Sequence, residues 1–188
     1  MPAVKLSPAM DQYMRFKRQH PDAILFFRMG DFYEMFFDDA VEASSLLGLT
    51  LTSRNHGRTS GEVPLAGFPH HAGESYLAKL VQMGRKVAIC EQVEDARKAK
   101  GIVKRDVVQV VSPGTTLSDT MLDSRRNNFI ACLSTDGQNG TGTTAGMAIV
   151  DLSTGDFSVE EMPVDNLADE LERLAPTELL LSETADES

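Results

Sequence analysis

The 188-residue sequence predicts two α/β units in tandem. Apolar residues repeat alternately at helical and at strand spacing, which is the pattern of helices packed on sheets. The segment SPGT, which starts at Ser112, is a strong break in that pattern, and the charge balance changes there. We therefore expect a first domain over residues 1–113, a linker over residues 114–127 and a second domain over residues 128–188.

The two domains differ in charge. Residues 1–113 carry 15 Lys and Arg against 13 Asp and Glu, whereas residues 114–188 carry 3 against 15. Because neutralisation of phosphates supplies much of the affinity for nucleic acids, a DNA contact would belong to the first domain. No apolar run approaches the roughly 20 residues of a membrane span, and the start, MPAVKLSPAMDQYMRF, has no apolar block that ends in a small-residue cleavage site. We expect a soluble, cytoplasmic protein that does not bind membranes.

Local signals predict the elements of the first domain. Ser7 followed by Pro8 is typical of a helix start, so we predict a helix over residues 8–19. The aromatic-rich run AILFFR fits a mostly buried strand. The further predictions are a turn at 29–31, a helix over 36–47 that ends at Gly48, a strand at 49–52, irregular chain over 53–71, a helix over 72–83, and strands at 86–90 and 106–111.

The second domain begins with three apparent strands that suit a meander of hairpins. We predict these strands at 129–133, 145–152 and 157–161, then an amphipathic helix over 165–174 and a strand at 179–181. A strand in an α/β layer is normally followed by a covering helix. We therefore expect residues 128–188 to be only part of a domain.

The segment RMGDFYEMF, from Arg28 to Phe36, places aromatic rings and a carboxylate directly after a tight turn. If this backbone is extended, Phe32 and Glu34 share one face and Tyr33 points to the other. An apolar ring can insert between base steps of DNA, and a neighbouring carboxylate can then hydrogen-bond to the displaced base. From spacing alone, a core Phe32 beside an exposed Glu34 is the commoner arrangement.

Six blocks in this order carry a resemblance to a known family: GDFYE after a strand, LLGLTLTSR, PLAGFPHHA, YLAKLV, VAICEQVED and VVSPGT. Over residues 7 to about 182, the chain resembles the N-terminal region of MutS proteins, which act in DNA mismatch repair. The resemblance implies a mixed-sheet mismatch-recognition domain followed by part of a connector domain with a ribonuclease-H-like fold. It also implies that Phe32 stacks on a mispaired base and that Glu34 hydrogen-bonds to it.

Three further residues are candidates for contacts with the DNA backbone. The resemblance implies that Arg54 lies near the DNA, and a guanidinium suits phosphate geometry. His70 and His71 follow a proline where relatives have a backbone contact, but adjacent side chains point apart, so we expect at most one to reach DNA. We predict no metal site, because no other ligand has suitable spacing. The basic segment 97–105 could contact phosphate, but a solvated loop is roughly twice as common for such a segment, and we leave it out of the site.

The sequence contains no G-x-x-x-x-G-K-[ST] phosphate-binding loop, so we assign no cofactor and no catalytic residue to this chain. We expect it to bind mispaired or unpaired bases in duplex DNA. The resemblance implies that the full-length protein would use ATP and Mg²⁺, form a homodimer and work with downstream repair proteins such as MutL. Two alternatives are a protein-interaction module built on the acidic second domain, and a metal-dependent nuclease that uses Asp151.

Overall fold

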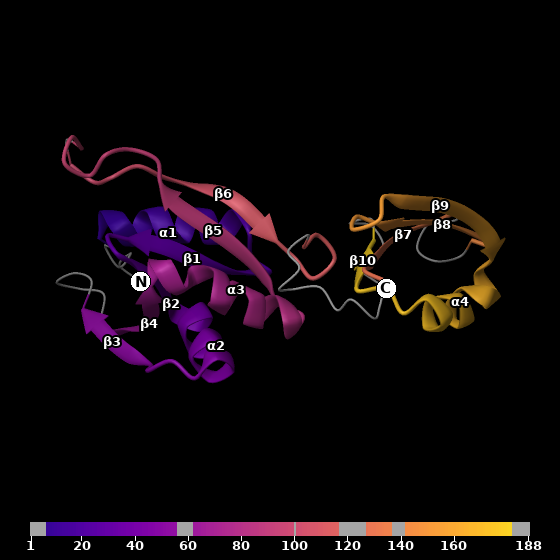
Figure 1. The fold of residues 1–188 in the computed structure, drawn as a ribbon, viewed down its shortest axis with the longest axis horizontal. Helices are drawn as coiled ribbons and strands as arrows, with labels where there is room; N and C mark the ends of the chain where they lie inside the picture. Colours follow the sequence, from indigo (N-terminus) through magenta and orange to yellow (C-terminus); the bar gives the residue numbers. More distant parts are fainter. Residues whose placement is uncertain (1–6, 56–61, 100, 117–126, 137–141, 182–188) are drawn as a thin grey trace, which may run out of the picture. The chain divides into compact units, whose positions relative to one another are not determined.

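The computed structural model describes residues 7–55, 62–99, 101–116, 127–136 and 142–181. The chain divides into two compact units, Met1–Val111 and Ser112–Ser188, which Figure 1 shows as ribbons. Each unit has its own sheet with helices packed on it, as the α/β prediction requires. Most of the predicted linker, residues 117–126, lies outside the described residues, so the linker stays a prediction.

The first unit contains one mixed sheet in the strand order β3-β4-β2-β1-β5-β6. Strands β1 and β5 are parallel, and all other neighbours are antiparallel. The elements are α1 (Pro8–Gln19), β1 (Ala23–Met29), β2 (Phe32–Phe36), α2 (Phe37–Leu47), β3 (Thr52–Asn55), β4 (Glu62–Pro69), the 3-10 helix η1 (His70–Ala72), α3 (Gly73–Gln82), β5 (Lys86–Gln92) and β6 (Arg105–Val111).

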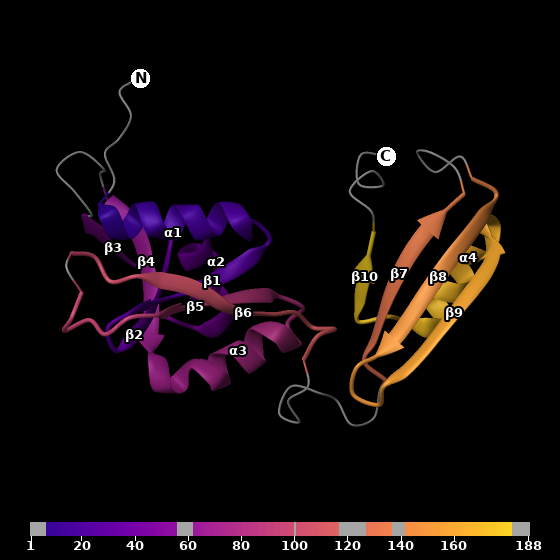
Figure 2. The same ribbon diagram turned by 90° about the horizontal axis from the view of Figure 1, so that it is seen from above.

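Strand β1 lies inside this sheet because its run AILFF is apolar on both faces and is buried throughout. Helices α1 and α3 cover opposite faces (Figure 2). On the α1 side, the ring of Tyr13 packs edge-on against Phe27, with centroids 5.5 Å apart. On the α3 side, the ring of Tyr76 lies 4.3 Å from that of Phe68. The alternation of β1 and its neighbours therefore builds two apolar layers.

The structure corrects the sequence prediction at β3 and β4. The strand predicted at 49–52 lies at Thr52–Asn55, and part of the predicted irregular chain is strand β4. Proline and glycine are uncommon inside strands, and β4 contains Pro64 and Gly67, so its local sequence resembles a loop. Pairing with β2 on one side and β3 on the other makes the segment a strand.

The buried carboxylate of Asp39 joins α2 to α1 and β1. Asp39 is 4% exposed. Its oxygens accept hydrogen bonds from the hydroxyl of Tyr13 (2.6 Å), Nζ of Lys17 (2.7 Å) and the backbone N–H of Leu25 (3.1 Å). Burial, together with the charge of Asp39, raises the pKa of Tyr13 far above its ordinary value, so the phenol remains a donor. These bonds compensate the cost of burying a charge.

The second unit contains a four-stranded sheet in the order β10-β7-β8-β9, in which β10 and β7 are parallel and the other pairs antiparallel. Helix α4 covers one face (Figure 2), where Leu171 and Leu174 pack against Met147 and Ile149. The elements are β7 (Phe129–Thr135), β8 (Thr144–Asp151), β9 (Asp156–Pro163), η3 (Val164–Asn166), α4 (Leu167–Leu174) and β10 (Glu178–Leu180).

Hydrogen bonds attach the segment that follows β6 to this second unit. Oε2 of Glu178 accepts hydrogen bonds from Oγ of Ser112 and from the N–H of Gly114. The amide of Asn128 donates to the carbonyls of Pro113 (3.2 Å) and Gly114 (3.0 Å). The break predicted at SPGT is therefore a bonded turn that belongs to the second unit.

The carboxylate of Asp151, at the end of β8, binds backbone groups on two sides. It accepts hydrogen bonds from the N–H (2.9 Å) and Oγ (2.6 Å) of Ser153 and from the N–H of Asn128 (3.1 Å). These bonds, led by that of the Ser153 hydroxyl, hold the pKa of Asp151 below its ordinary value. Asp151 thus ties the turn after β8 to the start of β7.

Asp39→Ala is expected to lower the free energy of unfolding of the first unit by about 3 kcal/mol, because it removes the carboxylate that accepts hydrogen bonds from the Tyr13 hydroxyl, the Lys17 ammonium and the Leu25 N–H. Urea unfolding followed by tyrosine fluorescence measures this loss, since all three tyrosines lie in the first unit. The matched control is Asp38→Ala, which removes an exposed carboxylate from the same helical turn. Equal losses in the two variants would contradict the prediction.

Asp151→Asn is expected to destabilise the second unit at neutral pH, with a difference from the unaltered protein that shrinks as the pH falls below about 4. The folded pKa of Asp151 is depressed, so its contribution is fully present above the unfolded pKa and is lost as the pH falls through the folded pKa. Circular dichroism during thermal unfolding at several pH values measures the difference. The same pH dependence in both proteins would argue against this role.

Candidate nucleic-acid interface

Phe32 and Glu34 lie on the same face of β2, as the predicted extended backbone requires. Tyr33 and Met35 point to the opposite face and are buried. In the sheet, Phe32 is opposite Met29 of β1, and Glu34 is opposite Phe27 of β1. The Phe32–Glu34 pair therefore lies on the same face of the sheet as Phe27, which is the face on which α1 packs.

Phe32 is unusual among the phenylalanines of this sheet because it is exposed. Its exposed fraction is 47%, whereas those of Phe26, Phe27, Phe36 and Phe68 are 2% or less. It is the first residue of β2 and follows the turn directly. Phe32 is therefore not a core residue of the first unit, and its ring is accessible for stacking.

The turn that precedes Phe32 is held on two sides. Gly30 has φ of +60°, a left-handed conformation that favours glycine. Nε of Arg28 donates to the carbonyl of Gly30 (2.5 Å), and the N–H of His70 donates to the carbonyl of Asp31 (2.8 Å). Nδ1 of His70 also lies 3.1 Å from that carbonyl. His71 is exposed and has its ring centroid 6.0 Å from that of His70.

The structure therefore brings His70 close to the Phe32–Glu34 pair, since Phe32 is opposite Pro69 in β4. His70 has protein partners at both its backbone nitrogen and Nδ1. Arg54 lies in β3 opposite Val63, and its side chain is outside the described residues. The DNA-backbone roles predicted for these residues and for His71 stay predictions.

Gly67 is a site residue that the sequence analysis missed. It is opposite Glu34 in β4, and a Cβ atom there would lie 2.8 Å from the carbonyl oxygen of Tyr33 and 3.5 Å from Cα and Cγ of Glu34. The absence of a side chain therefore leaves space for β2 and for the Glu34 side chain. The only local signal was a glycine inside PLAGFP, which equally fits a loop.

Arg105 was also missed, because it ends a basic segment that was expected to be solvated. Arg97, Lys98 and Lys104 are exposed as expected, but Arg105 is only 8% exposed. It begins β6, and its guanidinium lies 4.8 Å over the ring of Phe27, on the same face as the Phe32–Glu34 pair. The pairing of β6 with β5 places it there, and no local pattern indicates this.

On the opposite face, Tyr33 anchors β2 to β5. Its hydroxyl donates a hydrogen bond to Oε1 of Glu91, whose Oε2 lies 3.5 Å from Nη1 of Arg28. Burial, followed by the bond to Glu91, raises the pKa of Tyr33 to about 12, so the phenol stays protonated. This contact fixes which residues of β2 face inward.

The second unit offers a weaker case for chemistry. Among the described residues, no group of three or more His, Cys, Asp or Glu is arranged to hold a metal ion. The carboxylate of Asp151 already binds Ser153 and Asn128. Metal-dependent cleavage needs several carboxylates that converge.

Among the helices of the described residues, none has the length and apolar character needed to cross a membrane.

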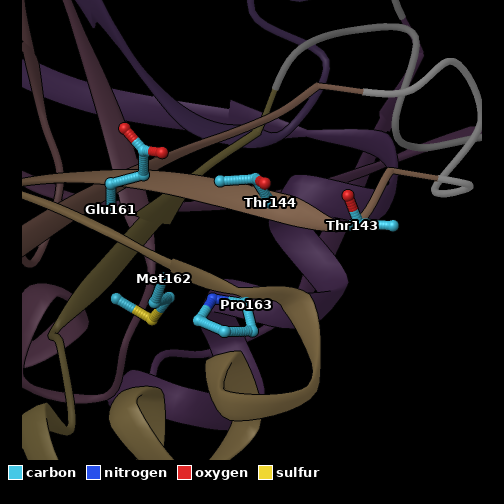
Figure 3. A pocket seen from close by; sticks show the side chains of 5 residues that line it. All are labelled: Thr143, Thr144, Glu161, Met162 and Pro163. Carbon is cyan, nitrogen blue, oxygen red and sulfur yellow. The ribbon is translucent and has the colours of Figure 1, made fainter.

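A hollow of about 400 Å³ lies on the second unit, at the ends of β8 and β9 (Figure 3). Its lining residues are Thr143, Thr144, Glu161, Met162 and Pro163. Only one of these side chains is charged, and binding pockets normally combine apolar walls with several convergent polar groups. We assign the hollow no role.

Gly67→Ala is expected to lower the free energy of unfolding of the first unit by about 2 kcal/mol or more, because the new methyl group would overlap a backbone carbonyl that the sheet holds in place. Tyrosine fluorescence during urea unfolding measures the loss. Gly146→Ala is the control, followed by circular dichroism because the second unit contains no tyrosine; among the described residues its Cβ would have only the carbonyl of Ser134, 4.0 Å away, as a neighbour. A Gly67→Ala protein as stable as the unaltered chain would refute the packing argument.

Comparison with known families matches both units. Residues 7–120 match the family described as MutS domain I, and residues 128–188 match MutS domain II. The two-part α/β prediction, a mismatch-recognition domain followed by part of a connector domain, agrees with these matches and with the two sheets.

Several curated proteins named DNA mismatch repair protein MutS are close relatives. The protein from Chlorobaculum parvum is 50% identical over 176 residues, which cover 94% of this chain and 20% of the relative. The protein from Methanothrix thermoacetophila is 50% identical over 177 residues, with the same coverage. The protein from Desulfatibacillum aliphaticivorans is 49% identical over 189 residues, which cover 100% of this chain and 21% of the relative. The chain spans about a fifth of the length of these relatives, and it belongs to the MutS family of DNA mismatch repair proteins.

Proposed function

We propose that this chain binds mispaired or unpaired bases in duplex DNA, with Phe32 stacking on the base and Glu34 accepting a hydrogen bond from it. The exposure of Phe32 is the observation that carries the proposal. A ring that is 47% exposed at the start of a strand, with a carboxylate on the same face, can enter a base step without unfolding the sheet.

The proposed mechanism selects bases by the cost of opening the helix. Insertion of a ring unstacks a base step at a cost of a few kcal/mol, and this cost is lowest where pairing is already weak. Stacking of a base on an aromatic ring contributes about 1–3 kcal/mol. The Phe32–Glu34 pair therefore favours a mispair over a matched pair, and backbone contacts hold the duplex in place.

The backbone contacts proposed here involve residues outside β2, on strand β3 and on the 3-10 helix η1. Arg54 of β3 and the exposed His71 of η1 are the candidates for phosphate contacts. His70 has a different proposed part, because its bonds to Asp31 hold the turn before Phe32. These assignments predict that Arg54→Gln weakens binding to mispaired and matched DNA alike.

The activity of the whole protein is also part of the proposal, because this chain covers about a fifth of its relatives. We infer that the whole protein couples base recognition to ATP binding and hydrolysis with Mg²⁺. It would act as a cytoplasmic homodimer with downstream repair proteins such as MutL. The relatives' name, DNA mismatch repair protein MutS, supports the repair role from which these inferences start. No catalytic residue is assigned to the present chain.

Phe32→Ala is expected to reduce the preference for a duplex with one G·T mispair over the matched duplex by about tenfold or more, because the stacking contribution is lost. Fluorescence anisotropy at low salt measures both affinities, in this chain and in a protein extended to the full length of its relatives. Glu34→Gln should also reduce the preference. Phe157→Ala, which removes a 68% exposed ring from the second unit, is the matched control and should leave it unchanged.

Three results would count against this proposal. If Phe32→Ala leaves the preference intact but lowers the stability of the first unit, Phe32 has a structural role. If affinity is insensitive to DNA and salt but responds to a partner protein, the chain is an interaction module. If the duplex is cleaved when Mg²⁺ or Mn²⁺ is added and Asp151→Asn abolishes cleavage, the chain is a nuclease.

A further inference from the structure

Arg105 is a buried cation whose guanidinium is fixed by several partners. Nε donates to the carbonyl of Arg28 (2.7 Å), and Nη1 donates to Oε1 of Gln12 and to the carbonyl of Val103, both at 3.0 Å. Nη2 lies 3.5 Å from Sδ of Met29. With these contacts, the plane of the guanidinium has one defined orientation.

The guanidinium contacts the two residues of β1 that lie opposite the Phe32–Glu34 pair. Its Cζ is 4.8 Å from the centre of the Phe27 ring, and Phe27 is the cross-strand partner of Glu34. Met29, which Nη2 contacts, is the cross-strand partner of Phe32. Residues directly opposite each other in antiparallel strands have side chains on the same face and in contact range. Arg105 therefore lies over the strand next to both members of the pair.

The electrostatic environment links Arg105 to Glu34. Burial lowers the pKa of the Arg105 guanidinium, and the neighbouring groups of Cys90 and Glu34 act against that effect. A guanidinium remains protonated even when its pKa falls, so a positive charge persists on the face of the sheet that carries Glu34. A buried ion is costly compared with a hydrophobic residue of similar size, so stability alone does not explain an arginine at this position.

We propose that Arg105 is a positioning residue for the Phe32–Glu34 pair: it orients the Glu34 carboxylate toward the mispaired base and holds the end of β1 against β2. This inference rests on the proposed function. Arg105 acts through Glu34 and Met29, and its own hydrogen bonds are to protein groups. A carboxylate held in one orientation accepts a hydrogen bond from a base with less loss of side-chain entropy than a freely rotating one.

The test is a double-mutant cycle between Arg105 and Glu34, measured as the ratio of affinities for the G·T and matched duplexes in the full-length protein. Arg105→Met and Glu34→Gln should each reduce this ratio by a similar factor, and the double variant should lose little more than either single variant. Arg105→Lys, which keeps the charge but not the planar fork, should give an intermediate loss. Independent losses that multiply in the double variant would overturn the inference.

Arg85→Met is the matched control, because Arg85 is another arginine of the first unit, half exposed and paired with Glu42 (2.8 Å) away from the Phe32–Glu34 pair. It should leave the ratio unchanged. If tyrosine fluorescence shows that Arg105→Met does not fold, Gln12→Met becomes the deciding variant. It removes one hydrogen-bond acceptor of the Arg105 guanidinium and leaves the charge of that guanidinium in place. A partial loss of preference in folded Gln12→Met supports the inference, and an unchanged preference overturns it.

Failure of this inference can be distinguished from failure of the proposed function. If Phe32→Ala abolishes the preference for the mispair but the folded Arg105→Met protein retains it, Phe32 acts as proposed and Arg105 has only a structural role. If the unaltered protein shows no preference for the mispair, the proposed function is wrong, and the role of Arg105 is overturned with it.

Discussion

Strand β2 pairs with β1 and β4 in a register that places Glu34 opposite Phe27 on one side and Gly67 on the other. Side chains alternate along a strand, so a slip of one residue would move Phe32 and Glu34 to the opposite face and bring Tyr33 to theirs. The register is fixed from both faces. Tyr33 is bonded to Glu91 on one face, and Gly67 admits β2 closely because it has no side chain.

The same alternation gives the two faces of β2 different environments. One face is a closed aromatic layer, in which the rings of Phe26 and Phe68 pack edge-on with centroids 4.9 Å apart. The other face changes along its length from the apolar layer beneath α1 to the end where the half-buried Glu34 and the exposed Phe32 lie. Rigidity beneath an exposed ring matters for stacking, because a ring that must be ordered on binding loses part of the favourable energy.

The second unit is organised by carboxylates with structural partners. Asp151 binds the turn after β8, and Glu178 binds the segment that follows β6. Each accepts hydrogen bonds from backbone N–H groups, which a carboxylate satisfies strongly. The large negative charge of residues 114–188 therefore includes groups that hold the fold and is not in itself a sign of metal chemistry.

The sequence by itself determined the features that depend on neighbouring residues. These are the start of α1 after Ser7, the end of α2 at Gly48, and the shared face of Phe32 and Glu34. It could not identify β4, whose proline and glycine resemble a loop, or predict that Gly67 lies opposite Glu34 and that Arg105 lies over Phe27. Those features depend on pairing between segments far apart in the chain, and pairing energy is a property of the assembled sheet that no local pattern encodes. Only the tertiary structure decided that Phe32 is exposed, because the burial of a side chain depends on which distant segments of the assembled fold cover it.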